Sequence, residues 1–105
     1  MNNMISTEIK EKYGAEYLLR QMSEECNEAA QAALKLIRAW KKETPASEEE
    51  CRQKLVEELA DVKLMICWVR DRVLTMEESM QITRTMDDKA VRAYRRMILG
   101  EADAQ

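Results

Sequence analysis

The chain has 105 residues, which is enough for one domain built around a single core. It contains only two glycines and one proline, and Ala, Glu, Lys, Leu, Arg and Met dominate, so the composition favours helices. The formal net charge of −3 provides no basic excess for binding nucleic acid or a membrane surface, and we expect neither partner. The absence of histidine and of any Cys-x-x-Cys pair excludes the usual zinc sites.

The N-terminal segment MNNMISTEIKEK is polar and has no apolar run that could form the core of a signal peptide. No stretch of the chain approaches the roughly 18 continuous apolar residues of a membrane-spanning helix. We therefore expect a cytoplasmic protein whose three cysteines are reduced thiols.

The first half of the chain predicts a short helix and then a long one. The short helix covers about Thr7–Tyr13 and is followed by Gly14. Helical spacing of apolar residues then predicts a long helix, which Pro45, the only proline, ends. Its apolar stripe consists of Leu18, Met22, Cys26, Ala29, Ala33, Ile37 and Trp40.

Two capping-box patterns predict two further long helices. Ser47 with Glu50 places a helix start at Ser47, and Thr75 with Glu78 places another at Thr75. Gly100 is a plausible stop for the last helix. The apolar stripe of the first of these helices is Leu55, Leu59, Val62, Ile66, Val69 and Val73, and that of the second is Met76, Met80, Met86, Ala90, Tyr94 and Met97.

These elements predict an all-α fold, a single domain over residues 1–105. It is an elongated bundle of one short and three long helices. Helices of this length reach roughly 40 Å, whereas the radius of gyration of a compact chain of this size is about 13 Å. The sides of the bundle would then be incompletely covered. We expect a four-helix-type core completed by oligomerisation into a homodimer or homotetramer, the alternative being a monomer with shorter helices.

Two acidic motifs stand out, Glu24-Glu25-Cys26-Asn27-Glu28 and Glu58-Leu59-Ala60-Asp61. Acidic residues three apart usually form a solvated helix face. On a helical wheel, however, Glu25 and Glu58 fall inside the apolar stripes of their helices, and Glu28 and Asp61 lie at the edges of those stripes. Glu24 points further outward. The pattern therefore predicts four carboxylates that face one another between two helices.

Carboxylates in an interior are costly unless they are paired or bound to a metal. Four facing carboxylates repel one another unless a divalent cation neutralises them. Ligands that are all oxygen atoms select a hard ion, so we expect Mg²⁺, with Mn²⁺ as a possibility. Because Mg²⁺ keeps waters and recruits substrate phosphates, the chemistry indicated is metal-assisted attack of water on a phosphoanhydride.

Glu-Glu-x-x-Glu followed by Glu-x-x-Asp in an all-helical chain resembles the MazG-like nucleoside triphosphate pyrophosphohydrolases. The resemblance spans roughly residues 17–96 and includes the strings LLRQMSEECNEAAQAALKLIRA and LVEELADVKLMI. It implies Mg²⁺-dependent cleavage of a (deoxy)nucleoside triphosphate between the α- and β-phosphates, which releases monophosphate and pyrophosphate. The metal ligands that it implies are Glu25, Glu28, Glu58 and Asp61, and the catalytic acids are Glu24, which orients or deprotonates the water, and Glu25.

The same resemblance implies that the basic run near the C-terminus contacts substrate phosphates through Lys89, Arg92 and Arg95. A solvated basic face that complements the helix dipole is an equal alternative for the two arginines. Gln21 and Trp68 lie near the acidic motifs and are candidates for binding the base, although tryptophans at such positions are more often core or interface residues.

Two other functions stay open. One is a dUTPase-like or dCTPase-like enzyme with narrow base specificity, and the other is a catalytically idle helical module that dimerises or binds a partner. The interval between the motifs, residues 29–57, is long for MazG-like sequences. The lack of histidine argues against a phosphoribosyl-ATP substrate.

Overall fold

The computed structural model describes residues 7–9 and 12–101, and within them all regular structure is helical, which confirms the all-α class. Thr7–Ile9 and Lys12 are helical where the short helix was predicted, Tyr13 at its end is not helical, and Lys10 and Glu11 lie outside the described residues. Three long helices follow. They are α2 (Ala15–Trp40), α3 (Glu48–Arg72) and α4 (Met76–Met97).

The chain divides into two compact units, the first ending at Val73 and the second beginning at Leu74. The first contains α2 and α3, and the second contains α4, none of whose residues is buried. The single domain and the oligomer therefore remain predictions. None of the described helices is both long and apolar enough to cross a membrane.

The end of α2 differs from the prediction. Pro45 lies in the connection, whereas the helix ends at Trp40 because Lys42 adopts a left-handed backbone with φ of 57°. The amide of Lys42 donates to the Ala39 carbonyl at 3.1 Å, and that of Glu43 donates to the Arg38 carbonyl at 2.9 Å. This pair of bonds is a Schellman motif, which satisfies the last carbonyls of the helix without a proline.

The predicted helix starts are confirmed by their hydrogen bonds. Ser47 caps α3, and its hydroxyl oxygen accepts from the Glu50 amide at 3.1 Å. Thr75 and Glu78 form a complete capping box at the start of α4, with bonds of 3.1 and 2.9 Å. Gly100 has φ of 70°, the left-handed conformation that favours glycine after a helix.

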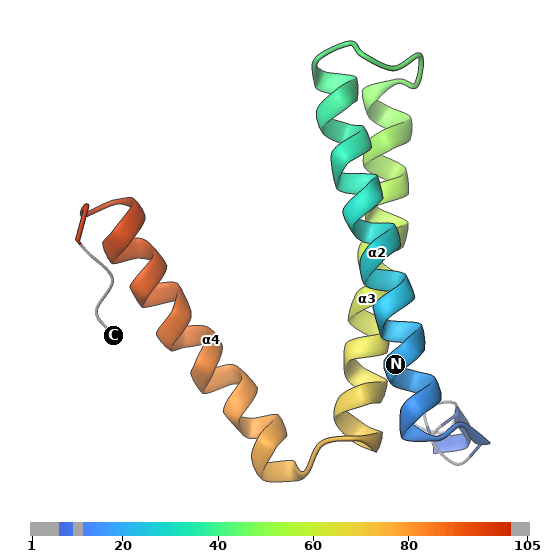
Figure 1. The fold of residues 1–105 in the computed structure, drawn as a ribbon, viewed down its shortest axis with the longest axis vertical. Helices are drawn as coiled ribbons and strands as arrows, with labels where there is room; N and C mark the ends of the chain where they lie inside the picture. The colour runs from blue at the N-terminus through green and yellow to red at the C-terminus, as the bar shows by residue number, and fades with distance from the viewer. Residues whose placement is uncertain (1–6, 10–11, 102–105) are drawn as a thin grey trace. The chain divides into compact units, whose positions relative to one another are not determined.

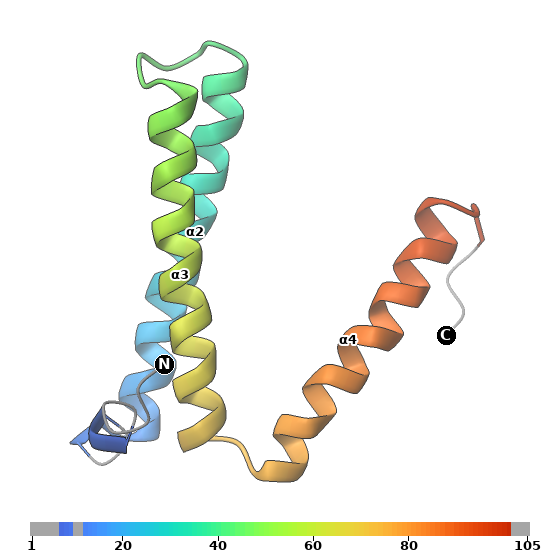
Figure 2. The same ribbon diagram turned by 180° about the vertical axis from the view of Figure 1, so that it is seen from behind.

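In the first unit, α2 and α3 run side by side in opposite directions (Figures 1 and 2). Near the start of α2 and the end of α3, a core cluster contains Leu18, Met65 and Val69, with exposed fractions of 1%, 7% and 7%. Closer to the connection, the buried apolar residues are Ala32, Leu36 and Cys51. Between these two apolar regions lies Glu58, a charged residue of which only 4% is exposed.

The predicted apolar stripes are wider than the surface that the two helices share. Ile37 of α2 and Leu59 and Ile66 of α3 belong to the predicted stripes, but about 40–47% of each is exposed. The buried residues lie on the side of each helix that carries Glu25 and Glu58. Several apolar side chains of α2 and α3 are therefore not buried by the contact between these two helices.

Candidate metal centre

Three carboxylates from two helices converge at the middle of the α2–α3 pair. Glu25 comes from α2, whereas Glu58 and Asp61 are three residues apart on α3 and so share one side of that helix. One carboxylate oxygen of each residue lies within 4.8 Å of the corresponding oxygens of the other two. We call these three residues the carboxylate triad.

Two oxygen atoms of the triad lack partners. Oε2 of Glu25 and Oε2 of Glu58 are both buried and accept no hydrogen bond. A buried polar atom without a partner costs free energy, and the cost is larger for a charged group. A donor set made only of carboxylate oxygens, two of whose residues have a buried oxygen without a partner, fits a hard divalent ion such as Mg²⁺.

The electrostatic environment shifts the pKa values of Glu25 and Glu58 in opposite directions. Burial, followed by the negative charges of Glu28, Asp61 and Glu58, raises the pKa of Glu25, and a hydrogen bond with Asp61 adds to the effect. The pKa of Glu58 is lowered because Lys54 donates a hydrogen bond to it and carries a positive charge. Lys54 Nζ lies 2.9 Å from Glu58 Oε1, and the pKa of Lys54 is raised in return.

The two other acidic residues of the predicted site lie outside the triad. Glu28 is exposed, but its carboxylate approaches Glu58 within hydrogen-bonding range. It therefore adjoins the triad without being part of it. Glu24 is exposed and points away from the triad, as its position on the helical wheel indicates. The structure thus brings together three of the four predicted metal ligands and places the fourth beside them.

Sequence reasoning missed two lysines. Lys54 and Lys35 border a pocket of about 250 Å³ between α2 and α3, which we call the lysine pocket. Its lining consists of Glu28, Gln31, Ala32, Lys35, Lys54 and Glu58. The spacing Lys54-x-x-x-Glu58 was a visible signal for an ion pair, whereas nothing in the sequence places Lys35 next to it.

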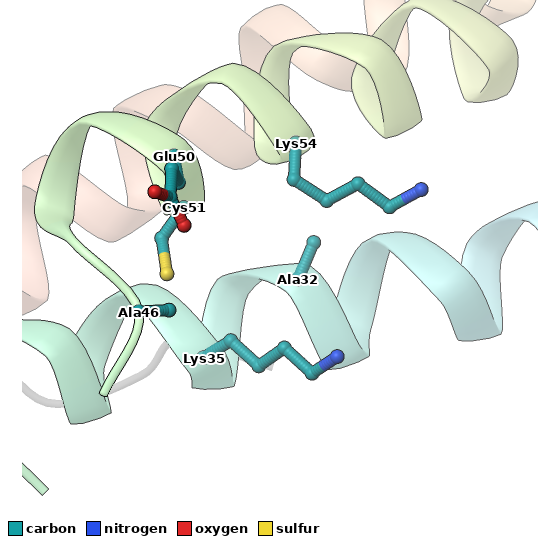
Figure 3. Close-up of a pocket in the computed structure, with 6 residues that line it drawn as sticks. All are labelled: Ala32, Lys35, Ala46, Glu50, Cys51 and Lys54. Carbon is teal, nitrogen blue, oxygen red and sulfur yellow. The ribbon is translucent and has the colours of Figure 1, made fainter. Parts of the chain in front are cut away.

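Figure 3 shows the two lysines in an adjoining pocket of about 230 Å³, which extends toward the connection. Lys35 comes from α2 and Lys54 from α3, and both side chains extend past Ala32 with their nitrogen atoms directed away from Cys51. Since Lys54 reaches Glu58, that direction leads toward the triad. Ala32, Ala46 and Cys51 provide small side chains that leave the space open.

The remaining predicted site residues are distributed over both units. Lys89, Arg92 and Arg95 lie on α4 and are exposed, and Arg95 Nε is 3.9 Å from Glu101 Oε2. In the first unit, Gln21 is half-buried on α2, one turn before Glu25.

Trp68 is the other candidate for binding the base. It packs against the core cluster of Leu18, Met65 and Val69, in agreement with a structural role. Its indole Nε1 is nevertheless buried without an acceptor, and indole nitrogens normally find one. Trp68 therefore remains a candidate for contact with a ligand.

Comparisons of the chain with protein-family models, with curated proteins and with solved structures gave no match. The likeness of the two motifs to MazG-like enzymes therefore remains an expectation from the sequence. Any function has to follow from the geometry of the site itself.

Proposed function

We propose that the protein is a Mg²⁺-dependent hydrolase that cleaves a (deoxy)nucleoside triphosphate between the α- and β-phosphates and releases monophosphate and pyrophosphate. The observation that carries this proposal is the carboxylate triad, in which one oxygen of each residue lies within 4.8 Å of one oxygen of each of the other two. Glu25 and Glu58 also each have a buried carboxylate oxygen without a hydrogen-bond partner. Glu25, Glu58 and Asp61, with Glu28 beside them, would hold the cation; Mn²⁺ has the same ligand preference. The resemblance to MazG-like enzymes supports the same reaction.

The bound cation would neutralise phosphate charge and lower the pKa of a coordinated water. The protein contributes carboxyl groups whose pKa values are shifted in opposite directions. These opposite directions describe the site without a cation, where Lys54 favours the ionised form of Glu58 and the neighbouring carboxylates disfavour that of Glu25. Glu25, whose carboxylate lies in the triad, is also a candidate for accepting a proton from an attacking water. Glu24, next to Glu25 but exposed, is a candidate for orienting that water from the solvent side.

Five residues are candidates for contacts with the substrate. Lys89, Arg92 and Arg95 of α4 are candidates for binding phosphates, and Gln21 and Trp68 are candidates for binding the base. A dUTPase-like or dCTPase-like specificity would be determined at the latter two positions.

We also propose that the protein is a homodimer or homotetramer, in which a second copy covers the exposed apolar side chains of α2 and α3. The three cysteines are free thiols, in keeping with our placement of the protein in the cytoplasm. A catalytically idle interaction module would also have exposed apolar side chains on α2 and α3. Enzymatic activity must therefore be measured directly.

The test uses the purified full chain with Mg²⁺ and a panel of NTPs and dNTPs, scored for pyrophosphate and for orthophosphate. We expect pyrophosphate, and we expect Glu25→Gln and Asp61→Asn to abolish its release. Glu49→Gln is the matched control, because Glu49 is an exposed acid at the start of α3. Orthophosphate as the first product, or activity that survives in both variants, would contradict the mechanism. A helical dimer without turnover of any nucleotide would favour the interaction module.

A further inference from the structure

The lysine pocket adjoins the carboxylate triad and shares Glu58 with it. Its lining combines two ammonium groups from different helices with the carboxylates of Glu28 and Glu58. Its volume of about 250 Å³ is several times the roughly 30 Å³ that one water occupies in the liquid, so it has room for a small anion.

The two oxygens of Glu58 have different surroundings. Oε1 is 2.9 Å from Lys54 Nζ, and Oε2 is buried without a partner. Glu58 can therefore offer Oε2 to a cation in the triad while Oε1 keeps Lys54 in place. An ammonium has three donors, so Lys54 retains donors for a second acceptor next to that cation.

Lys35 lies opposite Lys54 across the pocket. Both side chains extend past Ala32 in the same direction (Figure 3). Lys54 forms an ion pair with Glu58, whereas Lys35 forms no ion pair within the described part of the chain. A cationic side chain without a carboxylate partner at the edge of a pocket is available to an anionic ligand.

An anion in this pocket would also face the carboxylates of Glu28 and Glu58. The negative charges of the anion and of these carboxylates repel one another. A divalent cation between them would neutralise the carboxylates, while the two lysines bind the end of the anion that is farther from the cation. The ligand chemistry that fits is an oligophosphate chelated by a metal, with one end on the cation and the other on the ammonium groups.

We propose that the lysine pocket binds the β,γ-diphosphate end of the substrate and the pyrophosphate product, with Lys35 and Lys54 as the phosphate-binding residues. This inference rests on the proposed function and adds an orientation to it. The triphosphate runs from the triad toward the α2–α3 connection, and the nucleoside lies on the opposite side of the triad, toward Trp68. Lys35 thus acts on the leaving group and not on the α-phosphate.

The experiment measures binding of inorganic pyrophosphate to the full chain by calorimetry, with MgCl₂ and with EDTA. We expect binding only with Mg²⁺, and we expect Lys35→Met to weaken it about tenfold or more, the loss typical of a charge-assisted hydrogen bond. Affinity for a nucleoside monophosphate should stay within about twofold, since Lys35 does not reach the α-phosphate. Lys41→Met is the matched control, because Lys41 is an exposed lysine of α2's C-terminal turn that does not line the pocket.

Three results would overturn the inference. One is pyrophosphate affinity that Lys35→Met leaves unchanged. Another is a loss of monophosphate affinity as large as the loss for pyrophosphate. The third is the absence of Mg²⁺-dependent pyrophosphate binding by the unaltered protein. Failure of the proposed function would be seen in the turnover assay, as no hydrolysis of any nucleotide. The binding measurements test the lysine pocket independently of that result.

Discussion

Lys54 and Glu58 form an ion pair in which one partner is solvated and the other is not. The Nζ–Oε1 distance is 2.9 Å, the lysine side chain is 59% exposed, and the glutamate side chain is only 6% exposed. Exposed ion pairs contribute little to stability, whereas removing the partner of a buried charge leaves that charge uncompensated. The pair therefore holds a negative charge inside the α2–α3 unit when no cation is bound.

Lys54→Met should lower the thermal midpoint of the metal-free protein at neutral pH and leave the aliphatic stem in place. The pKa of Glu58 is lowered in the folded state from its ordinary value of 4.5, so the pair's contribution is present above pH 4.5. It is lost as the pH falls through the lowered value. The difference in thermal midpoint between the variant and the unaltered protein should therefore be smaller in acid than at neutral pH. Thermal melts at pH 7 and pH 3 measure it.

Arg52→Met is the control for this variant. Arg52 pairs with Glu48 on the same helix with the same spacing and an Nε–Oε1 distance of 3.1 Å, but both side chains are more than half exposed. We expect Arg52→Met to leave the thermal midpoint almost unchanged. Equal losses in the two variants would show that the burial of Glu58 has no energetic consequence.

Glu25→Gln should have opposite effects on stability without and with Mg²⁺. The folded state raises the pKa of Glu25, so it binds its proton more readily than the unfolded chain does. Ionisation of Glu25 therefore costs stability as the pH rises from 4.5 through the raised value. The variant removes that cost, and in EDTA at pH 7.5 it should be at least as stable as the unaltered protein.

In the presence of Mg²⁺, Glu25→Gln should be less stable than the unaltered protein. A cation at one hundred times its Kd stabilises the folded state by about 2.7 kcal/mol. If the loss of one ligand weakens binding about a hundredfold, the upper part of the range for outer-shell partners, the same concentration gives only about 0.4 kcal/mol. Urea unfolding with and without Mg²⁺ measures both values. Equal stabilisation of both proteins by Mg²⁺ would remove Glu25 from the metal site.

Ser47→Ala should destabilise the α2–α3 unit by about 1 kcal/mol, because the Ser47 hydroxyl oxygen accepts the Glu50 amide at the start of α3. The measurement is the urea midpoint at constant m-value. Ser23→Ala serves as the comparison, since Ser23 donates to the Leu19 carbonyl within α2 and alanine is the better helix former there. A loss at Ser23 as large as that at Ser47 would contradict a specific role for the cap.

Leu59→Lys and Ile66→Lys should reduce the oligomeric mass of the protein in light scattering. Both residues belong to the exposed apolar surface of α3, at 47% and 40% exposure, where a charge would be buried by a second copy. Gln53→Lys is the control, because Gln53 is an exposed residue of α3 that is polar and so does not belong to the exposed apolar side chains. A monomeric mass for the unaltered protein would reject the oligomer.

The helix starts and the inward positions of two carboxylates were predictable because both depend on local sequence. Ser47 and Thr75 are followed three residues later by glutamate, and the capping bonds are present. Glu25 and Glu58 fall in apolar stripes on a helical wheel, and Glu58 is buried. The convergence of these residues also required the register between α2 and α3, which a wheel for one helix does not contain.

The same limit explains what the sequence did not predict. Lys35 is unremarkable on α2 and acquires a role only because α3 places Lys54 across from it. The predicted apolar stripes on α2 and α3 include residues that the contact between the two helices does not bury. Periodicity shows which residues share a face of a helix, but it does not show which part of that face contacts the neighbouring helix. The left-handed residue that ends α2 is a lysine, Lys42, and no composition rule selects it over Pro45.

The placement of Glu58 between two separate apolar regions has a consequence for how the α2–α3 pair unfolds. The segment between the Leu18–Met65–Val69 region and the Ala32–Leu36–Cys51 region contains the facing carboxylates of Glu25, Glu58 and Asp61. Without a cation we expect each region to open separately, with the backbone amides near Glu25 and Glu58 exchanging with solvent faster than those of the two apolar regions. Metal binding would couple the two regions into one cooperative transition, so that the site determines the cooperativity of the fold as well as its chemistry.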